Sequence, residues 1–226
     1  MIIPAFVFTN HYEKPTTFML IFSIIDDYNI PEWAICLSSF LEKTNIKATV
    51  FFTGKVAESY PKCVTVFSKN VDIGSQTYSY VNLAAITDYD AQFEEVAKGK
   101  KAVDDAGNIY SRLFRAPYGA TNENIYSILS RLDIIADFSY KCQYNKYHKG
   151  QFIKFDLRTY NGTEHPVDFF LNLPSQSEPV ALIFNNHTSI EQIIRLLSEL
   201  KLGHIRFVNA SELTGLDLTI RGDQLV

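Results

Sequence analysis

Residues 46–55 read IKATVFFTGK, and residues 72–83 read DIGSQTYSYVNL. Within the first stretch, Ala48–Phe52 is a short, continuous apolar run of the kind that forms a strand buried on both faces. A second short strand is predicted at 71–73, and a helical segment around 63–68 separates the two. Buried strands that alternate with helical segments indicate a parallel sheet covered by helices, so this part of the chain predicts an α/β fold.

The same alternation extends along the rest of the chain. Apolar runs predict further strands at 18–25, 112–114, 134–138, 152–155, 180–184 and 205–208. Helical spacing of apolar residues predicts helices over 33–41, after an N-cap at Thr87, over 122–132, near 167–171 and over 189–200. We expect a single domain over residues 1–226 with a core at about 17–213. The pattern alone does not choose between an open sheet and a closed barrel.

Composition excludes several classes of function. The chain has 226 residues, 46% of them hydrophobic and 20% charged, which is typical of a globular protein. Its net charge of -4 and its lack of a long Lys/Arg run argue against nucleic acid or an anionic membrane as the main partner. No apolar run reaches the roughly 20 residues of a transmembrane helix. Residues 1–8 are apolar but lack the basic segment of a signal peptide, so none is predicted.

Two adjacent carboxylates, Asp26 and Asp27, follow the strand at 18–25 directly. The carboxyl ends of the strands carry the reacting residues in parallel β/α barrels. Two neighbouring carboxylates repel each other when both are buried and ionised, so one of them often binds a cation. The alternative is a solvated loop pair or a pair of helix-capping acids, which is the commoner case for Asp-Asp taken alone. The pair by itself leaves both readings open.

The block from residue 46 to residue 83 closely resembles the polysaccharide deacetylases (carbohydrate esterase family 4, chitin deacetylases included). Members of that family read His-Thr-Tyr-Ser-His where this chain has Gln76-Thr77-Tyr78-Ser79-Tyr80. The resemblance implies a distorted (β/α) barrel of about seven parallel strands. It also implies a site at which two histidines and a carboxylate hold a catalytic divalent metal, such as zinc. Here Gln76 and Tyr80 replace the two histidines.

The two carboxylates match the first motif of the family, Thr-Phe-Asp-Asp-Gly, as Ile24-Ile25-Asp26-Asp27-Tyr28. By that match Asp26 is the general base and Asp27 is the carboxylate metal ligand, while Tyr28 replaces a glycine. Glutamine offers only a neutral amide oxygen, and tyrosine has an unperturbed pKa of about 10. We therefore expect Asp27 to be a vestigial ligand and no metal to bind tightly.

Two further motifs are better preserved. Residues 115–119, Arg-Ala-Pro-Tyr-Gly, match the family's Arg-x-Pro-Tyr-Gly, in which the arginine orients the base and the tyrosine backbone helps to bind the oxyanion. By that match Arg115 and Tyr118 are site residues. The alternative is a structural Pro-Tyr-Gly turn with an ion-paired arginine. Residues 182–187, LIFNNH, resemble Leu-x-Leu-x-His, which makes His187 the candidate general acid. A single histidine after a strand is otherwise more often structural.

The fourth family motif, an aspartate followed by a tryptophan, is poorly represented. The nearest segment is 137–144, in which Tyr140 and Tyr144 fall roughly on the position of the tryptophan that packs against the acetyl group. We predict that Pro117, Gly119 and Tyr144 line the substrate cleft. Asn161, Asn186 and Asn209 each begin an Asn-x-Ser/Thr triplet, a pattern that also arises by chance.

Two functions from different classes follow from the resemblance. The protein is either a non-catalytic cell-wall module that binds a chitin-like or other N-acetylated polysaccharide, or an active hydrolase that removes N-acetyl groups through an atypical metal site. Retention of Asp26, Arg115 and His187 favours the hydrolase. The replaced ligands favour the module, because a base and an acid supply only about 10²–10⁴-fold each. We predict no meaningful deacetylase activity and a location outside the cell or in its wall.

Overall fold

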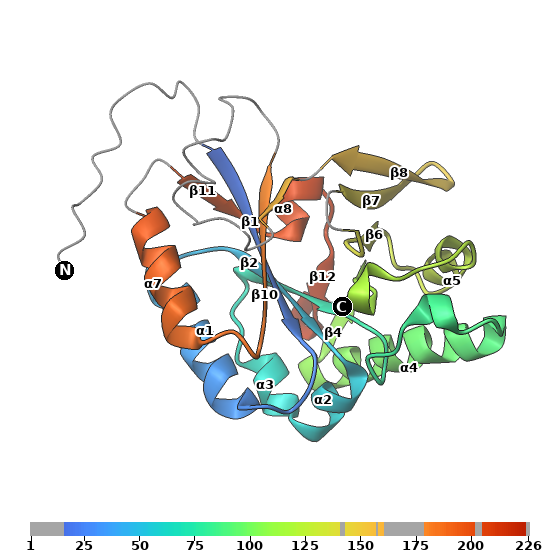
Figure 1. Ribbon diagram of the computed structural model, residues 1–226, viewed down its shortest axis with the longest axis horizontal. Helices are drawn as coiled ribbons and strands as arrows, with labels where there is room; N and C mark the ends of the chain where they lie inside the picture. The colour runs from blue at the N-terminus through green and yellow to red at the C-terminus, as the bar shows by residue number, and fades with distance from the viewer. Residues whose placement is uncertain (1–15, 141–142, 157, 161–178, 202–204, 225–226) are drawn as a thin grey trace.

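A computed structural model of the chain describes residues 16–140, 143–156, 158–160, 179–201 and 205–224. Its centre is a ten-stranded sheet in the order β8-β7-β6-β5-β3-β2-β1-β10-β9, with β11 paired to the start of β1 (Figure 1). The sheet is parallel from β9 to β6 and is curled into a half-barrel, with helices covering its outer side. The predicted α/β fold with a parallel sheet covered by helices is confirmed.

The strands of this sheet are β1 (Thr16–Ile24), β2 (Ala48–Phe52), β3 (Val71–Ser75), β5 (Leu113–Phe114), β6 (Ala136–Asp137), β7 (Gln143–His148), β8 (Gln151–Asp156), β9 (Arg158–Tyr160), β10 (Val180–Asn185) and β11 (Ile205–Val208). A separate antiparallel pair consists of β4 (Ile109–Ser111) and β12 (Thr219–Arg221). The helices are α1 (Ile30–Thr44), α2 (Gly54–Ser59), α3 (Pro61–Thr65), α4 (Tyr89–Gly107), α5 (Ile125–Arg131), α7 (Ile190–Lys201) and α8 (Ala210–Thr214). Short 3₁₀ turns cover Leu83–Ala85, Pro117–Gly119 and Gly222–Gln224.

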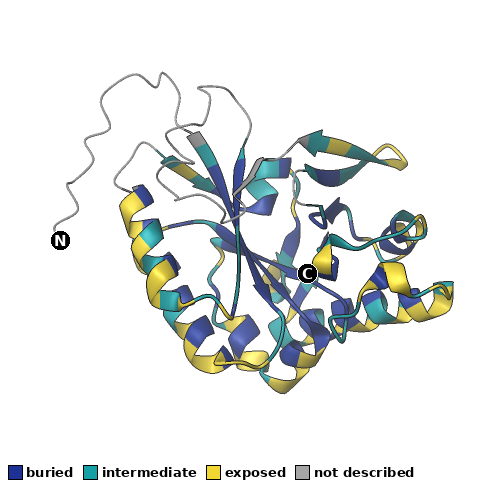
Figure 2. Cartoon of the chain, viewed as in Figure 1, coloured by how far each residue is buried: buried dark blue, intermediate teal, exposed yellow. Residues whose placement is uncertain are grey.

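The central strands are buried on both faces, as their continuous apolar sequences predict. All five residues of β2 are buried, and β1 contributes a run of buried side chains from Phe18 to Phe22 (Figure 2). One core cluster lies between the sheet and helices α1, α3 and α7, where Trp33 packs edge-on against Phe22 and donates its indole N–H to the Thr188 carbonyl at 3.0 Å. Because the strands run parallel, their carboxyl ends lie at a common edge of the sheet, and this edge carries the loops that contain the predicted site residues.

The structure corrects three details of the predicted elements. The N-cap of α4 is Asp88, whose carboxylate accepts from the Ala91 amide at 2.7 Å, and not Thr87. The strand at 152–155 is part of β8, which forms an antiparallel hairpin with β7 in place of a further parallel unit. A helix, α2, precedes the predicted one near 63–68, which is shorter and lies at α3. The helix predicted near 167–171 lies outside the described residues.

No helix in the described part of the chain has the length and hydrophobicity needed to cross a membrane.

Asp72 of β3 is a buried carboxyl group, and we expect it to make stability depend on pH. Burial raises its pKa from 3.8 to about 6, although the hydrogen bond from the Ser211 amide (2.6 Å) and the charge of Arg221 oppose the shift. The folded protein therefore binds this proton more tightly than the unfolded chain. The contribution of the protonated carboxyl group to the free energy of unfolding is lost as pH rises from 3.8 to about 6.

Asp72→Asn keeps an acceptor for the Ser211 amide and removes the titration. Urea unfolding of both proteins across this pH range should show wild-type stability falling relative to the variant, by at most about 1.4 kcal/mol per pH unit. Parallel pH profiles for the two proteins would contradict the assignment.

Candidate functional site

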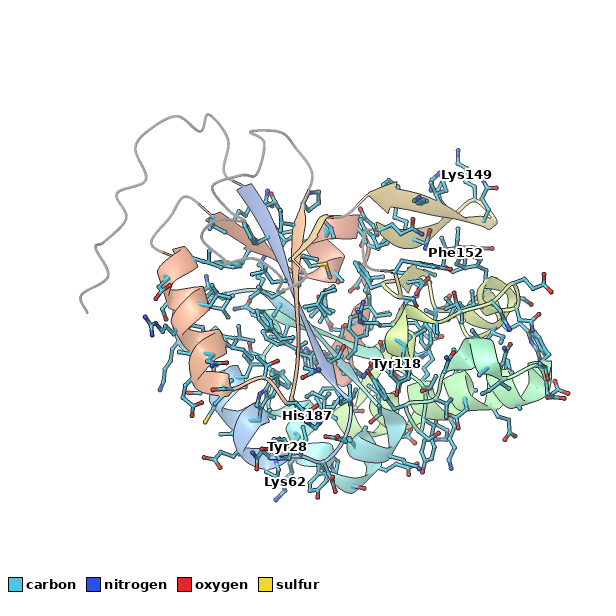
Figure 3. The ribbon with its side chains drawn as sticks, viewed as in Figure 1. Tyr28, Lys62, Tyr118, Lys149, Phe152 and His187 are labelled. Atoms are coloured by element: carbon cyan, nitrogen blue, oxygen red, sulfur yellow. The ribbon has the colours of Figure 1, made fainter. Side chains whose placement is uncertain are left out.

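Four loops meet at the carboxyl-terminal edge of the sheet. Residues 25–28 follow β1, residues 76–80 follow β3, residues 115–119 follow β5, and residues 186–187 follow β10. Because β1 lies between β2 and β10 in the sheet, segments about 160 residues apart in sequence come into contact here. Figure 3 shows Tyr28 and His187 together at this edge, with Tyr118 on the turn beyond β5. The structure thus brings together most of the residues that the motifs predict.

Asp26 is the centre of this group. Its Oδ2 lies 2.7 Å from Nε2 of His187, and its Oδ1 accepts from the Asn186 side-chain amide at 3.0 Å and from the Tyr28 backbone N–H at 3.1 Å. Partial burial raises the pKa of Asp26, but the hydrogen bonds from Asn186, His187 and Tyr28 outweigh burial and lower the pKa overall. The carboxylate is therefore held ionised, with each of its oxygens occupied.

Asn186 is a residue that the sequence did not single out as part of the site. It is only 1% exposed. Its amide nitrogen donates to the carboxylate and the backbone carbonyl of Asp26 and to the carbonyl of Tyr28, while its oxygen accepts from the Ile25 N–H at 3.0 Å. One buried amide thus holds the loop after β1 against the end of β10. The feature of the sequence that could have identified Asn186 as a site residue is its position directly before His187.

Tyr28 stacks on the candidate acid. The rings of Tyr28 and His187 lie 4.9 Å apart at an angle of 14°, and Tyr28 is 54% exposed. A glycine in this position, as in the family motif, has no side chain to cover the histidine. The replacement therefore adds an exposed aromatic ring next to Asp26.

Gln76 turns its amide group toward the sheet. It is 1% exposed, and its Nε2 donates to the backbone carbonyls of Ile24 (3.1 Å) and Phe51 (3.3 Å). These two bonds join the ends of β1 and β2 to the start of the loop after β3. Gln76 thus stabilises the strand ends in a position where the family has a metal-binding histidine.

Tyr80 lies within electrostatic reach of Arg115 and Asp26. Its backbone is left-handed (φ 60°), and its half-buried ring packs 5.1 Å from the ring of Tyr118. Burial and the neighbouring Tyr118 raise the pKa of Tyr80; Arg115 opposes this shift and Asp26 adds to it. The phenol is therefore protonated at neutral pH, and its oxygen is a poor metal ligand in that state.

The donor set does not fit a tightly held divalent metal. Asp27 is exposed, and its carboxylate makes no hydrogen bond or ion pair with the described residues. Gln76 uses its amide nitrogen on backbone carbonyls, and Tyr80 keeps its proton. Within the described ranges, no three His, Cys, Asp or Glu side chains are grouped as a metal site requires. Zinc sites in proteins are commonly built from three or four ligands drawn from these residue types.

The segment 115–119 forms a compact turn behind Asp26. Tyr118 and Gly119 both have left-handed backbones, with φ of 59° and 65°, and a Cβ on Gly119 would lie 2.7 Å from the Ser139 carbonyl oxygen. Glycine is therefore required at 119. Pro117 is buried, and Tyr118 is 69% exposed. The turn thus presents the Tyr118 ring to solvent.

Arg115 points from this turn into the protein. Its guanidinium donates to the Phe138 carbonyl and lies near the fully buried Asp137, whose charge partly offsets the lowering of the arginine pKa by burial. Asp137 accepts two hydrogen bonds from Ser139, and Asn145 lies opposite it in the β6–β7 pair. The sequence marked Asp137 only as the start of the segment nearest to the fourth motif and did not single out Ser139 or Asn145. The charge of Asp137 explains the orientation of the Arg115 guanidinium.

Tyr144, predicted to line the substrate cleft, is instead a core residue. It is stacked between Phe138 and Phe155, with ring separations of 5.2 Å on both sides. Three parallel rings in the interior bury apolar area that an exposed tyrosine would leave in water, which explains its position. The tryptophan-like wall expected from segment 137–144 is therefore not supplied by Tyr144.

An open hollow of about 660 Å³ lies elsewhere, between α4, β4 and the end of α5. Its charged side chains are largely paired with neighbours, as in Lys100–Asp104 and Lys101–Asp105. It contains none of the site residues.

Comparisons with known proteins agree with this architecture. A family model described as Polysaccharide deacetylase matches residues 13–136, which is more than half of the chain. A peptidoglycan-N-acetylglucosamine deacetylase of Bacillus cereus is 28% identical over 121 residues, 53% of this chain; the match spans only 42% of that relative's length.

Solved structures support the same fold. The Bc1960 peptidoglycan N-acetylglucosamine deacetylase, in complex with a benzamide compound, has a TM-score of 0.64 at 19% identity and covers 92% of both chains. A CE4 family pseudoenzyme from Bacillus anthracis has a TM-score of 0.61 at 15% identity, covering 90% of this chain and 66% of its own. A mutant described as that pseudoenzyme with restored enzymatic activity has a TM-score of 0.64 at 15% identity, with 90% and 68% covered. The chain therefore belongs to the polysaccharide deacetylase family, carbohydrate esterase family 4.

Proposed function

We propose that this protein binds a glucosamine-type polysaccharide of the cell wall, such as an N-acetylglucosamine polymer, without deacetylating it. The arrangement of Gln76 and Tyr80 carries the proposal. Two family ligand positions hold an amide that is bonded to strand carbonyls and a protonated phenol. In the family the metal activates water and polarises the amide, and these residues supply neither effect.

The state of Asp26 supports the same conclusion. A general base works best when its pKa lies near the working pH, but the pKa of Asp26 is lowered and both of its oxygens are engaged. The candidate base, Asp26, and the candidate acid, His187, form a hydrogen bond with each other. A water at Asp26 would share the carboxylate with these partners, which lower its basicity.

The relatives motivate the choice of ligand. The curated relative is named as a peptidoglycan-N-acetylglucosamine deacetylase, and one structural neighbour is described as a pseudoenzyme of the same family. A family member that keeps the surface around Asp26 but lacks the metal ligands retains the means to bind such a glycan. Cell-wall or extracellular location follows as part of the proposal.

We expect no chelator-sensitive acetate release from chitin oligomers or peptidoglycan fragments by the wild-type protein, with or without added zinc or cobalt. Binding of the same ligands should be measurable by calorimetry in parallel. Acetate release that is abolished by a chelator would establish the alternative, an active hydrolase with an atypical metal site. The retained Asp26, Arg115 and His187 are the residues that favour this alternative.

A further inference from the structure

Exposed aromatic rings gather around Asp26. Among the described residues, the large hydrophobic side chains exposed to solvent are Tyr28, Ile35 and Tyr118, and two of these three belong to the site. Large exposed apolar groups that collect in one place mark a binding surface more often than scattered ones do. The concentration of rings therefore indicates a ligand with a face that can stack.

The rings form two pairs that approach Asp26 from different loops. Tyr28 stacks on His187, which contacts Asp26 directly. Tyr80 packs against Tyr118 and lies within electrostatic reach of Asp26. By the family resemblance, Tyr80 replaces a metal-binding histidine and Tyr28 replaces a glycine, so both substitutions add a ring to this surface and one of them also removes a metal ligand.

The charges of the surface are incompletely compensated. Asp26 is paired with His187, but Asp27 has no partner among the residues that the structure describes. The guanidinium of Arg115 donates to the Phe138 carbonyl and interacts with the charge of Asp137, so its charge is already partly compensated there. The surface thus combines aromatic faces with a free carboxylate, a combination that favours a cation.

We propose that this surface recognises a glucosamine unit whose 2-amino group is free and protonated, in preference to an N-acetylated unit. The ammonium compensates the charge of Asp27 and packs against the tyrosine faces, while the sugar ring stacks on Tyr28 or Tyr118. An acetyl group would gain less binding energy here, because Tyr144, one of the two tyrosines expected to pack against it, is buried between Phe138 and Phe155. This inference rests on the proposed function as a glycan-binding protein without hydrolytic activity.

The test compares glucosamine oligomers with N-acetylglucosamine oligomers of equal length, by calorimetric titration of the full-length protein at mildly acidic pH. We expect the free-amine oligomers to bind about 10-fold more tightly, since the ammonium gains a cation–π contact and a charge contact that the acetylated amine lacks. Tyr28→Ala and Tyr118→Ala should each weaken binding several-fold. Unfolding by urea checks that these exposed substitutions leave stability unchanged.

A charge-matched pair of variants separates recognition from general attraction between a cationic polymer and a protein of net charge -4. Asp27→Asn should remove most of the preference for the free amine, whereas Asp90→Asn, at an exposed position in the first turn of α4, should not. Equal losses in both variants would overturn the inference. Tighter binding of the acetylated oligomer would also overturn it but leave the proposed function intact. Failure of both oligomers to bind would refute both.

Discussion

Replacing Gln76 and Tyr80 together by histidine is expected to raise the affinity for zinc by more than about 100-fold. Loss of a group that merely supports a metal ligand commonly lowers affinity by about 10–100-fold, and here two ligands are restored directly. With Asp27, the two histidines would form a three-residue site that leaves a position open for water. Calorimetric titration of the wild-type and double-mutant proteins with zinc measures the gain.

The surroundings favour histidine at position 80 but oppose it at position 76. Tyr80 has a left-handed backbone, which histidine adopts more readily than a bulky tyrosine does. At position 76 the imidazole would lose the bonds from the glutamine amide to the carbonyls of Ile24 and Phe51. We therefore expect some loss of stability, on the order of 1 kcal/mol per lost bond, alongside the gain in affinity.

Two controls make the result specific to this site. Lys101→His/Asp105→His places the same pair, also four residues apart, on the exposed face of α4, where the neighbouring Asp104 carboxylate is already engaged by Lys100 and the Ser111 N–H. Asp27→Asn in the double-histidine protein should remove most of the gain. If the α4 pair binds zinc as tightly, or if Asp27 has no effect, the assignment of these residues to one metal site is wrong.

The sequence predicted the sheet well because each buried strand is marked by a short run of apolar residues. The continuous apolar run at Ala48–Phe52 gave the bounds of β2 without error, and the order of the motifs placed Asp26, Arg115 and His187 on loops at one edge of the sheet. Parallel strands bring these ends together whatever the details of packing. The hairpin of β7 and β8 was missed, although Lys149-Gly150, both with positive φ, is the kind of turn that joins antiparallel strands.

The parts of the site that were not predicted depend on contacts between distant segments. The sequence marked Asn186 only by its place before His187 and as part of an Asn-x-Ser/Thr triplet, and its hydrogen bonds to residues 25–28 span about 160 positions. Tyr144 is buried because Phe138 and Phe155 close on its two faces, and no local pattern distinguishes that position from an exposed aromatic one. The direction of the Gln76 amide likewise follows from the nearby ends of β1 and β2.

The second large effect is expected at Gly99, in the middle of α4. A Cβ at this position would lie 2.6 Å from the Gln76 carbonyl oxygen and 2.8 Å from backbone atoms of Thr77 and Tyr78. Helix propensity alone favours alanine over glycine by about 1 kcal/mol. Overpacking costs about 1–3 kcal/mol where side chains can adjust, and here the obstructing atoms are backbone. We therefore expect Gly99→Ala to lower the free energy of unfolding by about 2 kcal/mol or more.

The backbone cannot move aside without breaking several bonds. The Tyr78 N–H donates to the Glu95 carbonyl of α4 at 2.9 Å, Ser79 is bound through its N–H and hydroxyl to the Glu95 carboxylate, and the Lys55 N–H donates to the Tyr78 carbonyl. Gly99 thus lets α4 pack directly on the segment that carries Gln76 and Tyr80. Chemical denaturation of the wild type, Gly99→Ala and Gly107→Ala provides the measurement.

Gly107→Ala is the matched control, because the atoms nearest to its Cβ would be side-chain atoms of Val64 and Ile109, at 3.0–3.2 Å. Those groups can shift, so we expect a change within about 1 kcal/mol. In the double-histidine protein, Gly99→Ala should also lower zinc affinity, since displacing residues 76–78 moves one new ligand away from Asp27, whereas Gly107→Ala should leave the affinity unchanged. If Gly99→Ala stabilises the protein as helix propensity alone requires, the close packing of α4 on this segment does not position the site.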